Sequence, residues 1–349
     1  MTEKANQRKK SFRFVLSALI SGIVFVVSVI YIVIAPNIRL SGDQEEAYLY
    51  IYDNFTFEDV KQQLTEGKVM LNTGTFALVA KAMNYDERVR PGRYLLREGM
   101  SNLSLVRRLR NGSQEPVQLT INNIRTREQL IKLLSRELMA DSASLMELFT
   151  NDSLIAAYGF NRETITSVFI PNTYELFWDT DAQELLDRMY KEYNRFWTNE
   201  RLVKAASIPL TPSEVITLAS IVEEESNKRS EHPVIAGLYI NRLKIGMPLQ
   251  ADPTVRFSLN DFTIKRVLFG HLRNPSPYNT YRNKGLPPGP IRLPSINVID
   301  AVLDYTQHDY LFMSAKETLN GEHNFARNGS EHMQNARKYQ QALDARGIR

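Results

Sequence analysis

The stretch TPSEVITLASIVEEES, residues 211–226, is the clearest helix signal in the chain. Thr211 is a capping residue, Pro212 takes the first helical position, and Glu214 follows the cap by three residues. This pattern is typical of a helix start. At 100° per residue, the apolar side chains of the following turns form one stripe. We therefore expect an amphipathic helix that packs on a core and ends in three consecutive carboxylates.

These carboxylates are Glu223, Glu224 and Glu225. Helical spacing puts Glu224 nearly opposite the apolar stripe, where we expect it to be solvated. Glu223 and Glu225 lie on the two flanks of the stripe, and Glu225 is somewhat closer to it. A carboxyl at the edge of an apolar face is partly desolvated, which raises its pKa and suits a general acid. The alternative, which the charge pattern alone favours, is a solvated acidic helix end.

Polar side chains on irregular backbone follow this helix. Asn241 and Arg242 precede a loop at 246–254 that Gly and Pro control, and a proline-rich irregular stretch is expected over 270–297. Amides, hydroxyls and flat rings without clustered cations suit an uncharged polar polymer such as a glycan better than a phosphate backbone. Each of these segments, taken alone, is also explained as turn chemistry. The candidates for substrate binding are Ser226, Asn241, Arg242, Gln250, Asp252, Thr254, Tyr278, Asn279, Thr280 and Tyr281.

The composition excludes several classes of site. None of the 349 residues is cysteine, which excludes cysteine nucleophiles, disulfide frameworks, thiolate zinc sites and iron–sulfur clusters. The five histidines have no metal-ligand spacing, and the motifs of phosphate loops and nucleophile elbows are absent. No metal or organic cofactor is therefore expected. Five of the 43 basic and one of the 39 acidic residues lie in 1–13, so the rest carries 38 of each and no nucleic-acid partner is expected.

An apolar run begins directly after this basic tail. Phe14 to Ala35 are 22 positions without a charged residue, and about 20 such residues in a helix span a bilayer. Because the basic residues flank only its N-terminal side, we expect tail 1–13 in the cytoplasm and the body outside. The alternative is a cleaved signal peptide, whose apolar region has about 7–15 residues and ends at small residues. This run is longer and lacks such a site, so we expect a single-pass anchor in the cell (inner) membrane.

The chain outside the membrane is long enough for two folded units. A polar spacer is expected at 36–46, and a small β/α module at 47–121. The module has predicted strands at 48–52, 93–96 and 117–121, and predicted helices from 56, over 75–83 and over 101–110. Further helices are predicted at 126–138, 142–150 and 182–197 and after residue 330. The fold class is therefore α+β, with the larger mixed α/β domain at 122–349.

Four segments, in this order and spacing, resemble the YceG-like family of endolytic murein transglycosylases. They are ASIVEEES at 219–226, INRL at 240–243, MPLQADPTV at 247–255, and YNTY through GLPPGPI at 278–291. The match extends to PGRY at 91–94, PNTY at 171–174, HNF at 323–325 and the anchor, so it covers nearly the whole chain. The sequence departs from relatives at Asn172, where Asp is frequent, at Glu224, where Lys is common, and at Ala251, where Thr is common.

The resemblance implies a membrane-anchored lytic transglycosylase that cuts nascent peptidoglycan strands internally. It implies that 47–121 is similar to a LysM domain and that Glu225, directly before Ser226, is the catalytic glutamate. In that chemistry Glu225 protonates the oxygen between N-acetylmuramic acid and N-acetylglucosamine. It then accepts the proton of the muramoyl C6 hydroxyl, which closes onto C1 as a 1,6-anhydro end.

Two alternatives remain open at this point. One is a muramidase that uses water as acceptor, for which Asp252 would be the second carboxylate. The other is an inactive cell-wall binding scaffold of the elongation or division machinery. Because the anchor holds the body near newly made strands, penicillin-binding synthases are expected partners in each case.

Overall fold

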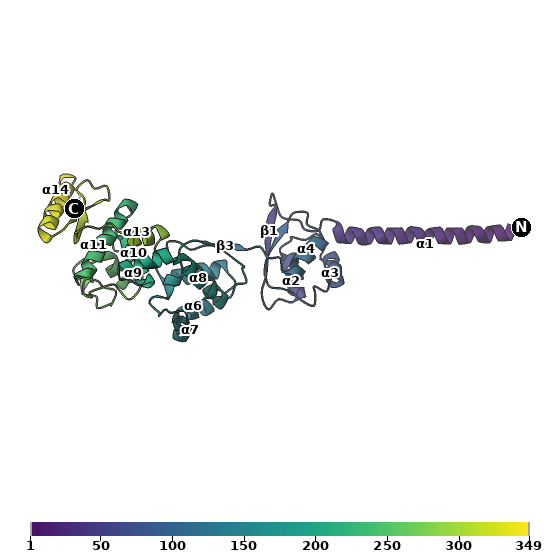
Figure 1. Ribbon diagram of the computed structural model, residues 1–349. Helices are drawn as coiled ribbons and strands as arrows, with labels where there is room; N and C mark the ends of the chain where they lie inside the picture. Colours follow the sequence, from purple (N-terminus) through teal and green to yellow (C-terminus); the bar gives the residue numbers. More distant parts are fainter. Residues whose placement is uncertain (1, 348–349) are drawn as a thin grey trace. The chain divides into compact units, whose positions relative to one another are not determined.

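The computed structural model describes residues 2–347, with side chains from residue 12 onward. It contains two compact units, Met1–Val117 with Glu175–Thr180, and Gln118–Tyr174 with Asp181–Arg349. Figure 1 shows the chain from α1 (Thr2–Ile34) to α14 (Gly329–Ala345).

The apolar run forms most of α1. Its segment Phe12–Ile34 has 23 residues with mean hydropathy 2.7, and it is exposed apart from Ile32 and Val33, which are half-buried against the first unit. Within the described residues it is the one helix that meets the length and composition of a membrane span by itself. The last turn joins the first unit, because Asn102 donates from its side-chain amide to the carbonyl of Ile32 at 2.9 Å. The basic tail 1–13 falls largely on residues whose side chains lie outside the described ones.

The first unit is built on a two-stranded antiparallel sheet. Strand β1 (Glu46–Ile51) pairs with β2 (Gly92–Arg97), so that Glu46 faces Arg97. Helices α2 (Phe57–Glu66) and α3 (Thr73–Ala82) come between these strands in the chain, and α4 (Asn102–Asn111) follows them. All five elements are as the sequence predicts. The capping side chain of Thr56 and the left-handed Gly112 after α4 explain where two of these helices begin and end.

One feature of this unit was not expected from the sequence. Residues 175–180 belong to it although they follow it by more than fifty positions. Trp178 packs edge-on against Tyr50 and Tyr52, with ring centroids 5.0 and 4.9 Å apart. The amide of Gln114 also donates to Asp179 at 2.8 Å. These contacts cover the buried ring of Trp178 and add stability beyond that of the βααβ core.

The second unit is mostly helical. Strands β3 (Val117–Thr120) and β4 (Thr173–Leu176) pair with each other. The expectation that 117–121 completes the sheet of the first module is therefore wrong, because the partner strand comes from more than fifty positions further along the chain. The other elements before α14 are α5 (Arg127–Glu137), α6 (Ser142–Thr150), α7 (Asp152–Ala157), η1 (Ile165–Val168), α8 (Ala182–Phe196), α9 (Asn199–Ser207), α10 (Pro212–Glu225), η2 (Arg229–Glu231), α11 (His232–Lys244), α12 (Asp252–Ser258), η3 (His271–Arg273), α13 (Ile296–Leu303), β5 (Phe312–Ala315) and β6 (His323–Ala326). The predicted helices are present, and 270–297 is irregular apart from η3 and the start of α13.

Helix α10 is the central element of this unit. It packs against α11, α12 and α13, and every residue from Val215 to Val222 is buried. The expectation of a half-solvated amphipathic helix is therefore wrong. The polar positions on the second face are covered as well, because Thr217 and Ser220 bond within the helix and the backbone amide of Ile291 donates to the Ser220 hydroxyl at 3.0 Å. A helix enclosed on all sides places its C-terminal carboxylates inside the unit.

Candidate active site

Glu225 is the last residue of α10 and is partly buried. The phenol of Tyr239, on α11, donates to its Oε1 at 2.7 Å. Burial raises the pKa of Glu225 to about 7, against the lowering effect of the Tyr239 hydrogen bond, and the negative charge of Asp252 adds to the rise. A carboxyl whose pKa is raised toward neutrality holds and releases a proton more readily at neutral pH than an ordinary one, which suits a group that first gives and then takes a proton.

Asp252 begins α12 and is exposed. The phenol of Tyr281 donates to its Oδ1 at 2.6 Å. Burial, the bond to Asp252 and the charge of Glu225 all raise the pKa of Tyr281 above its usual range. Tyr281 therefore remains a donor at neutral pH. Together, Glu225, Asp252 and two tyrosine phenols form the titratable centre of this unit.

Ser226 directly follows Glu225, but it is 5% exposed. Its hydroxyl donates to Glu231 at 2.8 Å, and the ring Nδ1 and backbone amide of His323 contact the same carboxylate at 2.9 and 2.6 Å. Burial raises the pKa of Glu231, but the hydrogen bonds from His323 and Ser226 outweigh it and the net pKa is lowered. Ser226 thus fixes the end of α10 and has no free face for a ligand.

Asn241 and Arg242 of α11 are also occupied by protein. The guanidinium of Arg242, 7% exposed, donates to the carbonyls of Leu249 and Leu311, each at 2.6 Å. The amide of Asn241 donates to the carbonyl of His308 at 2.6 Å. These two side chains tie the loop before α12 and the segment before β5 to α11, and in this way they position Asp252.

Three further candidates, Thr254, Asn279 and Thr280, hold the loop that carries Tyr281. They are buried, and the hydroxyls of Thr254 and Thr280 lie 2.8 Å apart. Asn279 donates to two carbonyls of its own loop. Gln250 is exposed and adopts a left-handed φ of 50°, and its backbone amide donates to the carbonyl of Thr280 at 3.1 Å.

The expectation that Glu224 is solvated is wrong. Its side chain is 11% exposed, and the guanidinium of Arg125 binds it in a bidentate pair at 2.9 and 3.2 Å. Arg292 adds a bond of 2.6 Å to the same carboxylate. The reason is tertiary: segments distant in sequence cover the face of α10 that the helical wheel leaves open. Glu223 is occupied too, since it accepts the backbone amide of Ser295 at 2.9 Å.

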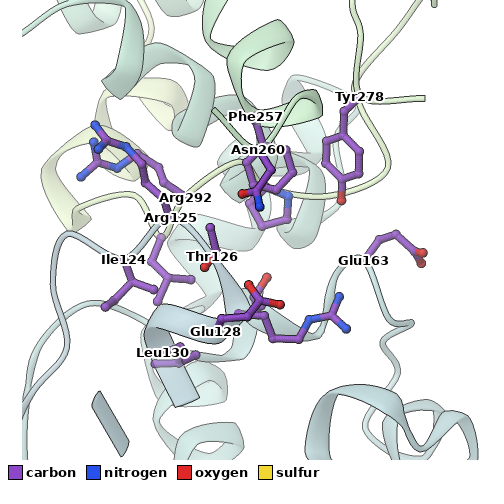
Figure 2. Close-up of a pocket in the computed structure, with 14 residues that line it drawn as sticks. Ile124, Arg125, Thr126, Glu128, Leu130, Glu163, Phe257, Asn260, Tyr278 and Arg292 are labelled. Atoms are coloured by element: carbon purple, nitrogen blue, oxygen red, sulfur yellow. The ribbon is translucent and has the colours of Figure 1, made fainter. Parts of the chain in front are cut away.

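Tyr278 lines a cavity of about 380 Å³ beside these arginines, and Asp252 is not among the residues that line it. Figure 2 shows Arg125 and Arg292 on one side of this cavity and Glu163 with Tyr278 on the opposite side. Of the ten predicted binding residues, the structure therefore brings Asp252 and Tyr281 to Glu225, takes Tyr278 to a neighbouring cavity, leaves Gln250 exposed and buries or engages the others.

Sequence reasoning missed three contributors to this region. Tyr239 is a buried phenol on an otherwise apolar stretch of α11, a signal that could have marked it. Glu231 and His323 are ninety-two positions apart, and the HNF match at 323–325 gave His323 no role at the site. Within residues 2–347, no group of three or more His, Asp or Glu side chains has the arrangement of a metal site.

Comparison with known proteins gives the family. The profile of the YceG-like family matches residues 49–338. The chain belongs to the YceG-like family. A yceG-like protein of Listeria monocytogenes has a similar solved structure, with a TM-score of 0.54, 24% identity, and coverage of 84% of this chain and 99% of that one. At this identity the likeness shows the fold alone.

Two curated relatives of this YceG-like chain are both named endolytic murein transglycosylase. The Bacillus subtilis protein is 36% identical over 164 residues, which are 46% of this chain and 44% of the relative. The Streptococcus pneumoniae D39 protein is 28% identical over 298 residues, which are 76% of this chain and 53% of the relative. The chain thus spans about half the length of the curated relatives it matches.

Proposed function

We propose that this chain is an endolytic murein transglycosylase in which Glu225 is the catalytic acid and base. The observation that carries the proposal is the raised pKa of Glu225, about 7, at a partly buried helix end beside Asp252. The names of the two curated relatives support the choice of substrate, a peptidoglycan glycan strand.

The geometry supports a two-step proton transfer at Glu225. In the first step the protonated carboxyl gives its proton to the glycosidic oxygen, the C1–O bond breaks, and positive charge develops at the muramoyl C1. The negative charges of Glu225 and Asp252 stabilise this cation. In the second step Glu225 takes the proton of the C6 hydroxyl as its oxygen bonds to C1. The products are a 1,6-anhydro muramoyl end and a free N-acetylglucosamine hydroxyl, and no water is consumed.

One observation favours a second candidate, the muramidase. Asp252 is exposed and close enough to affect the charge of Glu225, so it could instead activate a water. Hydrolysis normally needs such a second carboxylate. Replacing Asp252 by Asn separates the two: loss of activity from an enzyme whose products are reducing ends favours hydrolysis.

The deciding experiment is a digest of uncrosslinked peptidoglycan by the full chain in detergent, with mass spectrometry of the products. Wild type is expected to give muramoyl ends lighter by one water than reducing ends, and Glu225→Gln none. Glu137→Gln, a change on α5 at a half-buried side chain that within the described chain pairs only with its neighbour Arg136, is the matched control and should cut normally. Reducing ends from wild type would establish the muramidase, and binding without any cutting would establish the inactive scaffold.

A second part of the proposal concerns the N-terminal segment and the location of the protein. We infer that the segment Phe12–Ile34 is an uncleaved anchor of the cell (inner) membrane, with the tail 1–13 cytoplasmic and 122–349 the extracytoplasmic catalytic domain. The two helices between paired strands in the first unit support a LysM-like module at 47–121. Penicillin-binding synthases are the proposed partners, because an anchored enzyme of this length stays near strands as they are made. A protease added to intact spheroplasts should remove the body and spare the tail.

A further inference from the structure

We propose that the cavity beside α5 binds the stem peptide of the muramoyl residue that Glu225 attacks. This inference rests on the proposed function. It adds a peptide-binding site to an enzyme whose reaction requires only the glycan. The cavity is formed by the start of α5, the end of α12, the loop around Tyr278 and the segment 290–293. Its volume of about 380 Å³ falls within the range of small-ligand sites, about 300–1,000 Å³.

The charges of this cavity point to a ligand that carries both signs. Arg125 and Arg292 already have carboxylate partners in the protein: both pair with Glu224, and Arg292 also lies 3.5 Å from Glu223. Arg127 donates only to the carbonyls of Phe149 and Arg162, each at 3.1 Å, and across residues 2–347 it has no carboxylate partner. Its guanidinium and the N-terminus of α5 therefore favour a carboxylate of the ligand.

The cavity also has carboxylates without an ion-pair partner among the described residues. Glu128 and Glu163 are exposed, and neither forms an ion pair within the described chain. Glu163 is held in place by a close backbone approach, because a Cβ on Gly289 would lie 2.1 Å from the Glu163 carbonyl oxygen. These carboxylates favour an amine. A stem peptide offers both groups, since its second residue carries a free carboxylate and its third is a diamino acid whose side-chain amine is free in an uncrosslinked strand.

An apolar wall completes the cavity. The rings of Phe257 and Tyr278 lie 4.8 Å apart at 47°, and both line it. Such a surface packs against the methyl and methylene groups of alanyl and diamino acid residues. A bare glycan strand would leave these rings and the unpaired charges without a partner.

The distance to the reacting bond also agrees with a stem peptide. Asp252 is the first and Phe257 the next-to-last residue of α12, so the backbone of Phe257 lies about 8 Å along the helix axis from that of Asp252. An extended peptide covers this distance with two to three residues, at about 3.3–3.6 Å each. A stem attached to the lactyl group of the muramoyl residue at Glu225 would thus bring its second and third residues to the cavity.

The test compares two substrates with the full chain in detergent: uncrosslinked strands that carry tetrapeptide stems, and the same strands after an amidase has removed the stems. Wild type is expected to have a kcat/KM about tenfold higher on the first, the effect of one charge-assisted hydrogen bond. Arg127→Gln and Glu163→Gln should remove this preference and leave the rate on bare strands unchanged. Arg136→Gln and Glu137→Gln, at the other end of α5, are the matched controls.

A binding measurement keeps the test independent of turnover and of folding defects. Titration calorimetry should show that free N-acetylmuramoyl tetrapeptide binds to the Glu225→Gln chain. In the double variant that also carries Glu163→Gln, a change at an exposed side chain, binding should be about tenfold weaker. Equal cutting of both substrates by wild type, or equal binding with and without Glu163, would overturn the inference and leave the transglycosylase intact. An absence of cutting of both substrates, with peptide binding retained, would instead overturn the proposed function.

Discussion

Removal of the Tyr239 phenol gives the sharpest test of the proton chemistry at Glu225. The phenol donates to the carboxylate at 2.7 Å and thereby lowers the pKa of Glu225, which nevertheless stands at about 7 because burial raises it more. A hydrogen bond to a charged group contributes about 1.5–3 kcal/mol, and one pKa unit corresponds to about 1.4 kcal/mol. Tyr239→Phe should therefore move the pKa of Glu225 upward by about one unit.

The sign of the effect on activity follows from the first step. In the proposed mechanism cleavage needs protonated Glu225, so the rate is expected to fall as pH rises through its pKa. In Tyr239→Phe the alkaline limb should shift upward by about one pH unit, while the maximum rate falls because the carboxyl is less well oriented. The assay is kcat/KM for anhydro-end formation by the full chain in detergent, measured from pH 5 to 9.

A matched control removes a phenol–carboxylate bond elsewhere in the same unit. Tyr158→Phe deletes the donor to Asp187, and its pH profile should equal that of wild type. An alkaline limb that stays in place or moves to lower pH in Tyr239→Phe would refute the assignment of Glu225 as the acid whose pKa this phenol lowers.

Three further predictions concern stability and positioning. Because the folded pKa of Glu225 is raised, its favourable contribution is complete below about pH 4.5 and is lost as pH rises through about 7. Glu225→Gln should thus be more stable than wild type at pH 8, by up to about 3 kcal/mol in the free energy of unfolding, and equally stable at pH 4. Calorimetric scans should show a higher unfolding temperature for the variant at pH 8 and the same temperature for both proteins at pH 4. Arg292→Gln leaves the buried Glu224 with one partner and should cost about 2–4 kcal/mol in denaturant unfolding, part of which Glu224→Gln restores; a neutral Arg292→Gln would contradict this. Ser226→Ala, which removes a donor to buried Glu231, should lower kcat severalfold with KM unchanged, and a change confined to KM would instead indicate substrate contact.

The local elements of this protein follow directly from its sequence. Thr211 and Pro212 mark the start of α10, Thr56 marks that of α2, and the proline-rich stretch over 270–297 is irregular, because caps and backbone constraints act within a few residues. The apolar run that forms Phe12–Ile34 is equally local, since length and hydropathy suffice to identify it.

In the candidate active site, too, one part follows from the local sequence and the other from tertiary packing. Glu225 stands out in the sequence as a carboxylate on the flank of an apolar stripe, and the structure gives it a pKa of about 7. What it contacts depends on packing: Tyr239 comes from the next long helix and Asp252 from the one after it. The helical spacing of α10 cannot predict these partners, because they belong to other helices.

Glu224 makes the distinction clearest. The helical wheel places it toward water, yet Arg125 and Arg292, ninety-nine and sixty-eight positions away, enclose it. Likewise, Ser226, Arg242, Thr254 and Thr280 carry polar groups that a sequence assigns to substrate, whereas the structure uses them to hold loops. The sequence by itself determined the helix, its terminal carboxylates and the apolar N-terminal segment, because these depend on neighbours in the chain. Only the tertiary structure decided which polar groups face a ligand, because a buried donor or acceptor takes whatever partner the folded chain brings to it.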